Sequence, residues 1–69
     1  MTDKTTQDEI RKLDSLERRT KDPEKKAAVG LLLNTVRQWD AETDYKKKLE
    51  LVASIKRQRE VVRGLGVEV

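Results

Sequence analysis

Large apolar residues gather in one stretch of the chain, AAVGLLLNTVRQW, from Ala27 to Trp39. On a helix with about 100° per residue, its apolar positions cover an arc of about 240°, whereas the stripe of an ordinary surface helix covers about 100°. This pattern predicts a helix that is covered on two sides. The polar positions left for a narrow solvated strip are Gly30, Asn34, Arg37 and Gln38.

The stretch before it carries a thinner apolar pattern. Ile10, Leu13 and Leu16 stand three residues apart, which is typical of a helix that packs through one seam. Thr6 and Glu9 have the spacing of a capping box, in which each side chain accepts a hydrogen bond from the backbone N–H of the other residue. We therefore predict a disordered segment over residues 1–6 and a first helix over residues 7–21.

The clearest boundary in the sequence is the pair Asp22-Pro23. Aspartate is a favoured N-cap, and proline is favoured at the first helical position. The residue before a proline also avoids the helical conformation, so the preceding helix has to end there. The pair predicts a second helix over residues 23–40.

Residues 40–44 contain neither glycine nor proline, so the next boundary is inferred from the directions in which the apolar stripes before and after it face around a helix. The apolar stripe that follows comprises Tyr45, Leu49, Val52, Ile55 and Val62. In an unbroken helix, this stripe would lie about 170° from that of the second helix. We favour a tight turn capped by Thr43 or Asp40, followed by a third helix over residues 44–63. The alternative is one continuous helix from Pro23 to Arg63.

The end of the third helix has a glycine, Gly64, where a left-handed C-terminal cap is expected. Residues 64–69 are predicted to form a flexible tail. The elements together predict an all-α fold in a single domain over residues 1–69, either a small three-helix bundle or a helical hairpin. The connections are short, so sequential helices should be antiparallel neighbours.

The small size of the chain predicts that the fold is stabilised by something other than its own hydrophobic core. A domain of this length buries only about 60% of the surface that its unfolded chain exposes. The sequence contains no cysteine and no histidine, which leaves no disulfide, no thiolate metal site and no imidazole ligand. Oligomerisation is the usual remaining support for small scaffolds. We therefore expect an oligomer held by coiled-coil-like helix packing, with a homodimer favoured.

Charge and hydropathy narrow the class of protein. Sixteen basic and 13 acidic residues give a net charge of only +3, so the surface has mixed charge. No apolar run reaches the length of a transmembrane helix, and the first residues lack the apolar core of a secretory signal. With no cysteine present, we expect a cytoplasmic protein that does not bind membranes.

Metal binding and catalysis have little support in the sequence. Asp40, Glu42 and Asp44 alternate like the start of a calcium loop, but Tyr45 stands where glycine is needed and Leu51 where the bidentate glutamate is needed. Without histidine or cysteine, the commonest general base and the strongest nucleophile are missing. We expect no metal, no cofactor and no enzymatic activity.

The function that the pattern favours is binding to another protein. The chain would be a small accessory protein, a regulator, inhibitor or adaptor, that buries an apolar helix face against its partner. Tryptophan and tyrosine are enriched at binding hot spots. The predicted partner-binding residues are Leu31, Leu33, Val36, Trp39 and Tyr45.

Two alternatives stay open. The third helix and the tail carry a basic excess, which could bind phosphates of nucleic acid. The candidate residues for that contact are Lys46, Lys47, Lys56 and Arg57. Glu50 lies between Lys46 and Arg57 on their side of the helix, which argues against a continuous basic face. The second alternative is a structural bundle that assembles only with itself.

Overall fold

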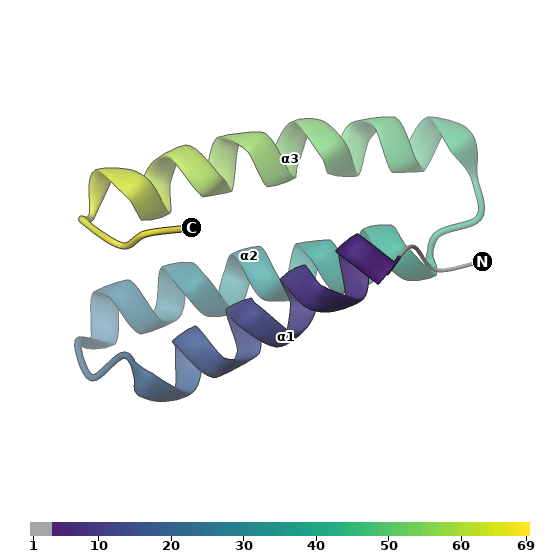
Figure 1. Ribbon diagram of the computed structural model, residues 1–69. Coiled ribbons are helices and arrows are strands. Elements are labelled where there is room, and N and C mark those ends of the chain that lie inside the picture. Colours follow the sequence, from purple (N-terminus) through teal and green to yellow (C-terminus); the bar gives the residue numbers. More distant parts are fainter. Residues whose placement is uncertain (1–3) are drawn as a thin grey trace.

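Three α-helices form a small bundle in the computed structural model, which describes residues 4–69. α1 spans Lys4–Arg19, α2 spans Pro23–Ala41 and α3 spans Tyr45–Gly64. α1 and α3 run in the same direction and α2 in the opposite one (Figure 1). Both outer helices pack on α2, whereas no backbone contact joins α1 to α3 among the described residues. The predicted all-α fold is confirmed as a three-helix bundle.

The core is supplied mainly by α2, as the wide apolar arc predicted. Its buried apolar residues are Leu13 from α1, Val29, Leu32, Leu33 and Val36 from α2, and Val62 from α3. Each fully buried side chain of this kind contributes roughly 1.5–3 kcal/mol through the hydrophobic effect. Thr35 is also buried, and its hydroxyl donates to the carbonyl of Leu31 at 3.0 Å, so this polar group is satisfied. α2 therefore organises the fold.

The turn between α1 and α2 follows the predicted chemistry. Asp22 is the N-cap of α2, and its Oδ1 accepts from the backbone N–H groups of Glu24 at 2.9 Å and Lys25 at 3.3 Å. Pro23 occupies the first helical position. α1 ends at Arg19, two residues before the predicted end, and the Thr20 hydroxyl donates to the last turn. The local cap and the proline together fix where the chain reverses.

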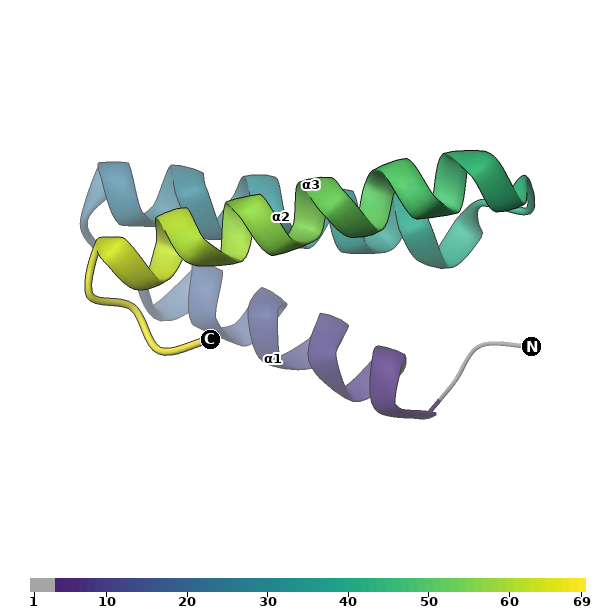
Figure 2. The ribbon, with the colours of Figure 1, turned by 90° about the horizontal axis from the view of Figure 1, so that it is seen from above.

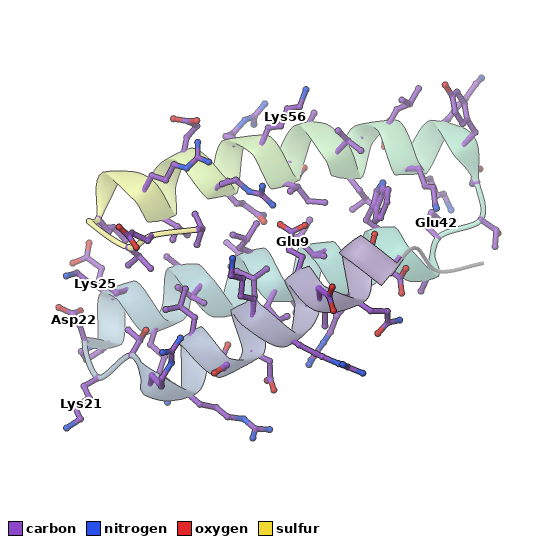
Figure 3. All side chains as sticks on the ribbon, in the orientation of Figure 1. Glu9, Lys21, Asp22, Lys25, Glu42 and Lys56 are labelled. Carbon is purple, nitrogen blue, oxygen red and sulfur yellow. The ribbon has the colours of Figure 1, made fainter. Side chains whose placement is uncertain are left out.

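The predicted turn between α2 and α3 is confirmed, and the alternative of one continuous helix is wrong. The Glu42 carboxylate accepts from the N–H groups of Thr43 at 3.1 Å and Asp44 at 3.0 Å. Asp44, rather than Thr43 or Asp40, caps α3, because its Oδ1 accepts from the N–H of Lys46 at 2.9 Å. Glu42, Thr43 and Asp44 thus make a turn without glycine or proline; Glu42 is labelled in Figure 3.

The predicted start of α1 is wrong. The helix already includes residues 4–6, which were expected to be disordered; residues 1–3 lie outside the described part of the chain. Thr6 is buried inside α1 instead of capping it, and the Glu9 side chain contacts Arg59 of α3. Tertiary contacts therefore replace the local capping box.

The C-terminal end of α3 closes at a different glycine from the one predicted. Gly64 is still helical, and Gly66 has the positive φ of 87°. The N–H of Gly66 donates to Arg63 at 2.9 Å and that of Val67 donates to Val62 at 3.3 Å, the bond pattern of a Schellman motif. The left-handed residue is therefore Gly66.

The tail that follows is packed rather than free. Val67 and Val69 are partly buried against the core, and an Arg63 guanidinium N–H donates to the carbonyl of Val69 at 3.5 Å. The yellow segment in Figure 1 accordingly turns back beneath the end of α3. The expectation of a flexible tail missed this packing, because the contact depends on how α1 and α3 flank α2.

Candidate protein-binding surface

The five predicted partner-binding residues do not form one surface. Leu33 and Val36 are core residues, at 3% and 2% exposure, so their assignment to a partner face is wrong. Leu31 is 56% exposed and Tyr45 is 73% exposed, whereas Trp39 is half-buried. The chain covers one side of the α2 arc with its own helices and leaves Leu31 on the open side.

Trp39 is held in place by a residue of α3. The Lys48 ammonium lies 4.6 Å from the centroid of the Trp39 ring, a cation–π geometry. The contact joins the last turn of α2 to the first turn of α3, and both side chains are half-buried. Trp39 is therefore part of the packing at this end of the bundle, with one portion still accessible.

The apolar stripe predicted for α3 divides into two rows. Val62 is buried and Ile55 packs against the core. Tyr45 and Leu49 are exposed, Leu49 at 53%. At about 100° per residue, Tyr45 and Leu49 lie roughly a quarter turn or more away from the row of Ile55 and Val62. A single stripe was therefore the wrong description, because only one of its rows meets α2.

The row that begins with Tyr45 and Leu49 continues along the whole of α3 and is called here the α3 flank; Val52 and Arg59 in it are half-buried and the others are exposed. Its members follow one another at intervals of four and three residues: Tyr45, Leu49, Val52, Lys56, Arg59 and Arg63. This alternation is the spacing of a coiled-coil seam. The first three members are apolar and the last three are basic. Sequence reasoning took only Tyr45 as a partner contact, although the four-three spacing could have identified Leu49 as well.

One basic residue of the α3 flank, Arg59, forms an ion pair with α1. The Arg59 guanidinium forms an ion pair with the Glu9 carboxylate, and Arg63 pairs with Glu60 at 3.5 Å. Figures 1 and 2 both show that α1 begins part-way along α3, so that the first turns of α3 extend past it. The apolar half of the flank lies on these first turns. It therefore has no helical neighbour on that side among the described residues.

The four residues proposed for nucleic-acid contact are all exposed. Lys46, Lys47, Lys56 and Arg57 take part in no ion pair within the described part of the chain. They do not share one face, because Lys47 and Lys56 lie about 100° to either side of the direction shared by Lys46 and Arg57. Figure 3 shows Lys56 pointing away from α2. Cationic charge thus surrounds α3 without forming one continuous strip.

A groove with a volume of about 1490 Å³ lies between α1 and the C-terminal end of α3. Its charged lining mixes both signs: Asp8, Glu9, Lys12, Arg19, Arg59, Arg63 and Glu68. The one hydroxyl in this lining, that of Thr20, donates to the carbonyl of Leu16 at 2.6 Å. This hydroxyl is therefore bonded to the backbone of α1 and not to a side-chain base.

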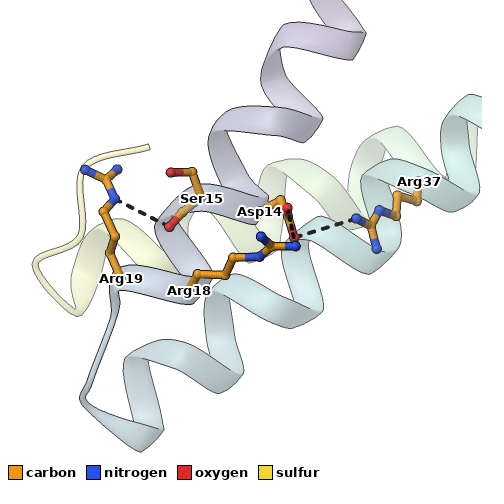
Figure 4. A network of polar contacts seen from close by, with 5 residues as sticks. All are labelled: Asp14, Ser15, Arg18, Arg19 and Arg37. Atoms are coloured by element: carbon orange, nitrogen blue, oxygen red, sulfur yellow. Dashed lines mark hydrogen bonds and ion pairs between the residues drawn. The ribbon is translucent and has the colours of Figure 1, made fainter.

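The polar contacts between α1 and α2 have a structural explanation. Asp14 lies 3.4 Å from Arg18 of its own helix and 3.8 Å from Arg37 of α2 (Figure 4). Nearby, the Arg19 side chain donates to the Ser15 carbonyl at 3.4 Å. Exposed pairs of this kind contribute at most about 1 kcal/mol each. Of these contacts only the Asp14–Arg37 pair joins α1 to α2, and the other two lie within α1.

The described part of the chain contains no cluster of three or more side chains suited to hold a metal ion. None of its helices combines the length and the apolar character that crossing a bilayer requires. The sequence matches no protein family, and comparisons with curated proteins and with solved structures found no match either. The α3 flank and its surroundings are therefore interpreted from their own geometry.

Proposed function

We propose that this chain is a small non-enzymatic protein-binding module, acting as a regulator, inhibitor or adaptor through the apolar half of the α3 flank. The observation that carries the proposal is the exposure of Tyr45 and Leu49, at 73% and 53%, one turn apart on the same face of α3. Both side chains are exposed at the same end of the bundle as half-buried Trp39.

The chemistry of these side chains suits a binding surface. Tyrosine combines a large rigid apolar area with a polar tip, and tyrosine and tryptophan are over-represented among residues that dominate binding energy. Burying an exposed leucine contributes up to roughly 1.5–3 kcal/mol. The fold itself gains little from leaving two such side chains in water. A partner that covers them explains their position.

The partner in this proposal is a different protein rather than a second copy. The homodimer predicted from the sequence rested on the need to shelter α2, including Leu33 and Val36. Both are buried within one chain, so that reason no longer applies, although the dimer stays a prediction. The absence of cysteine fits a reducing compartment, and we place the interaction in the cytoplasm.

The test is a pull-down from the native host's lysate with the wild type and a Tyr45→Ala, Leu49→Ala double variant, after light scattering has fixed the oligomeric state. The matched control is Val61→Ala, because Val61 is an equally exposed apolar residue of α3, at 56%, on a different side of the helix. We expect a captured protein that the double variant loses and the control retains. Identical capture by all three chains would contradict the proposal.

Nucleic-acid binding is the second candidate, because four exposed cations of α3 have no ion-pair partner among the described residues. Phosphate contacts make affinity fall steeply between about 50 and 200 mM salt. Binding of a DNA or RNA duplex that shows this dependence, and that is lost when Lys46, Lys47 and Arg57 are all changed to alanine, would favour this candidate. Apolar docking on Tyr45 and Leu49 would change little with salt.

A further inference from the structure

We infer that the partner segment is an acidic amphipathic helix that lies along the α3 flank. Its apolar residues would cover Tyr45, Leu49 and Val52, and its carboxylates would meet Lys56, the basic residue of the flank that has no ion pair among the described residues. This inference rests on the proposed function and adds the shape and the charge of the partner.

The shape follows from the spacing of the flank. Residues at alternating intervals of four and three keep to one side of a helix over many turns, and this is the arrangement that receives the side chains of a second helix. An extended strand would need exposed backbone N–H and C=O groups, which α3 uses in its own hydrogen bonds. Since α1 begins part-way along α3 (Figure 2), no helix of the described residues lies beside the first turns of α3 on the side of α1.

The charge follows from an internal example and from unpaired cations. The flank already receives one carboxylate from a neighbouring helix, because Glu9 of α1 forms an ion pair with Arg59. Lys56, one step earlier on the flank, is exposed and takes part in no ion pair within the described part of the chain. Lys46 borders the apolar half in the same unpaired state. A partner helix with acidic residues would supply carboxylates to these lysines, as α1 supplies the Glu9 carboxylate to Arg59.

The same charges argue against a second copy as the occupant. Residues 45–57 contain five basic residues and a single acidic one, Glu50. Two copies that met through this segment would bring ten cations and two anions to one small interface. Like charges at an interface oppose association and exclude wrong partners.

The test uses a displayed library of helical peptides of about 12 residues, the length of the flank from Tyr45 to Lys56 as an α-helix. Every peptide carries apolar residues at the four-three positions, and the remaining positions draw equally from glutamate, lysine and glutamine. Selection on the wild-type chain is expected to enrich glutamate over lysine. Enrichment of lysine, no preference between the two, or no enriched peptide at all would overturn the inference.

Matched variants then locate the bound peptide. Tyr45→Ala and Leu49→Ala should each weaken the selected peptides by about tenfold or more, as hot-spot contacts do, whereas Val61→Ala should leave affinity within about twofold. Lys56→Glu should weaken them by about tenfold, and Arg57→Glu, with the same change of charge about 100° around the helix, by much less. Circular dichroism confirms that each variant is folded. Equal effects of the two charge reversals would overturn the inferred position.

The outcomes separate the inference from the proposed function. Peptides that require Tyr45 and Leu49 but carry no acidic excess would leave the protein-binding surface standing and refute the acidic partner. If no selected peptide depends on Tyr45 or Leu49, both fail. Binding to vesicles of phosphatidylcholine and phosphatidylserine at about three to one, or to a DNA duplex, that Leu49→Ala abolishes would assign the flank to another class of partner. A dimer that Leu49→Glu dissociates would assign it to a second copy.

Discussion

The Glu9 carboxylate of α1 forms an ion pair with the Arg59 guanidinium of α3, across 50 residues of sequence. Among the described residues it is the one ion pair between these two helices, whose backbones do not contact each other. Both side chains are about one-third exposed, and the Arg59 Nε is buried without a hydrogen-bond partner among the described residues. The pair is therefore a partly solvated contact between α1 and the basic half of the α3 flank.

Replacing Glu9 by glutamine should destabilise the fold only slightly. Partly exposed ion pairs contribute about 0.2–1 kcal/mol, and salt screens them. We expect a loss of free energy of unfolding in that range, shrinking at about 1 M salt, measured by urea denaturation. Asp8→Asn is the control, since it removes the same charge from an exposed neighbour with no ion pair among the described residues. An equal loss from both variants would show that the Glu9–Arg59 contact is not the cause.

The two glycines at the end of α3 should respond to alanine with opposite signs. Gly66 has a φ of 87°, where a Cβ is strained, so Gly66→Ala should cost about 1–2 kcal/mol. Gly64 is helical, and a Cβ there meets no atom within 4 Å, so Gly64→Ala should be neutral or stabilise by up to about 1 kcal/mol. Thermal unfolding followed by circular dichroism measures both. A larger loss of stability from Gly64→Ala than from Gly66→Ala would show that Gly64 is the left-handed residue.

Adjacent leucines of α2 should differ sharply in what they contribute to stability. Leu33→Ala should cost about 2–5 kcal/mol, because Leu33 is buried in the core. A loss of that size is comparable to the whole stability of a small domain. Leu31→Ala should change the free energy of unfolding by no more than about 0.5 kcal/mol, as most surface substitutions do. Similar losses at both positions would mean that Leu31 is covered, as in an oligomer.

Gly30→Ala should stabilise α2. Glycine inside a helix costs roughly 0.5–1 kcal/mol relative to alanine. A Cβ at Gly30 would collide with the Glu17 carboxylate, but that group is the end of a flexible side chain and can rotate away. We expect a higher melting temperature, and a larger rise in a Glu17→Ala background, where the obstacle is gone. A lower melting temperature in the Glu17→Ala background would show that the glycine has another role.

Boundaries that depend on local chemistry could be predicted from the sequence. Asp22 and Pro23 act through their own backbone and the next residues, and the turn before α3 follows from a mismatch in phase between two stripes. The start of α1 and the end of α3 could not be read in this way. Thr6 is buried in tertiary packing, and the left-handed position was assigned to Gly64, whereas Gly66 occupies it.

The candidate site was predicted only in part, for a geometric reason. A helical wheel gives the width of an apolar arc but not the positions of the neighbouring helices around it. Leu33 and Val36 belong to the covered side of α2, and Leu31, with the same residue type as Leu33, belongs to the open side. The stripe of α3 posed the same problem, because Leu49 and Ile55 share one apolar pattern and face different surroundings.

The two rows of α3 have a consequence for how such a chain can change over evolutionary time. Ile55 and Val62 pack against the core, whereas Tyr45, Leu49 and Lys56 are exposed on the α3 flank. If the α3 flank binds a partner as proposed, substitutions there can change the partner without destabilising the fold. In divergent descendants of this sequence, we expect Ile55 and Val62 to vary only among apolar residues, and the residues of the α3 flank to vary in size and charge.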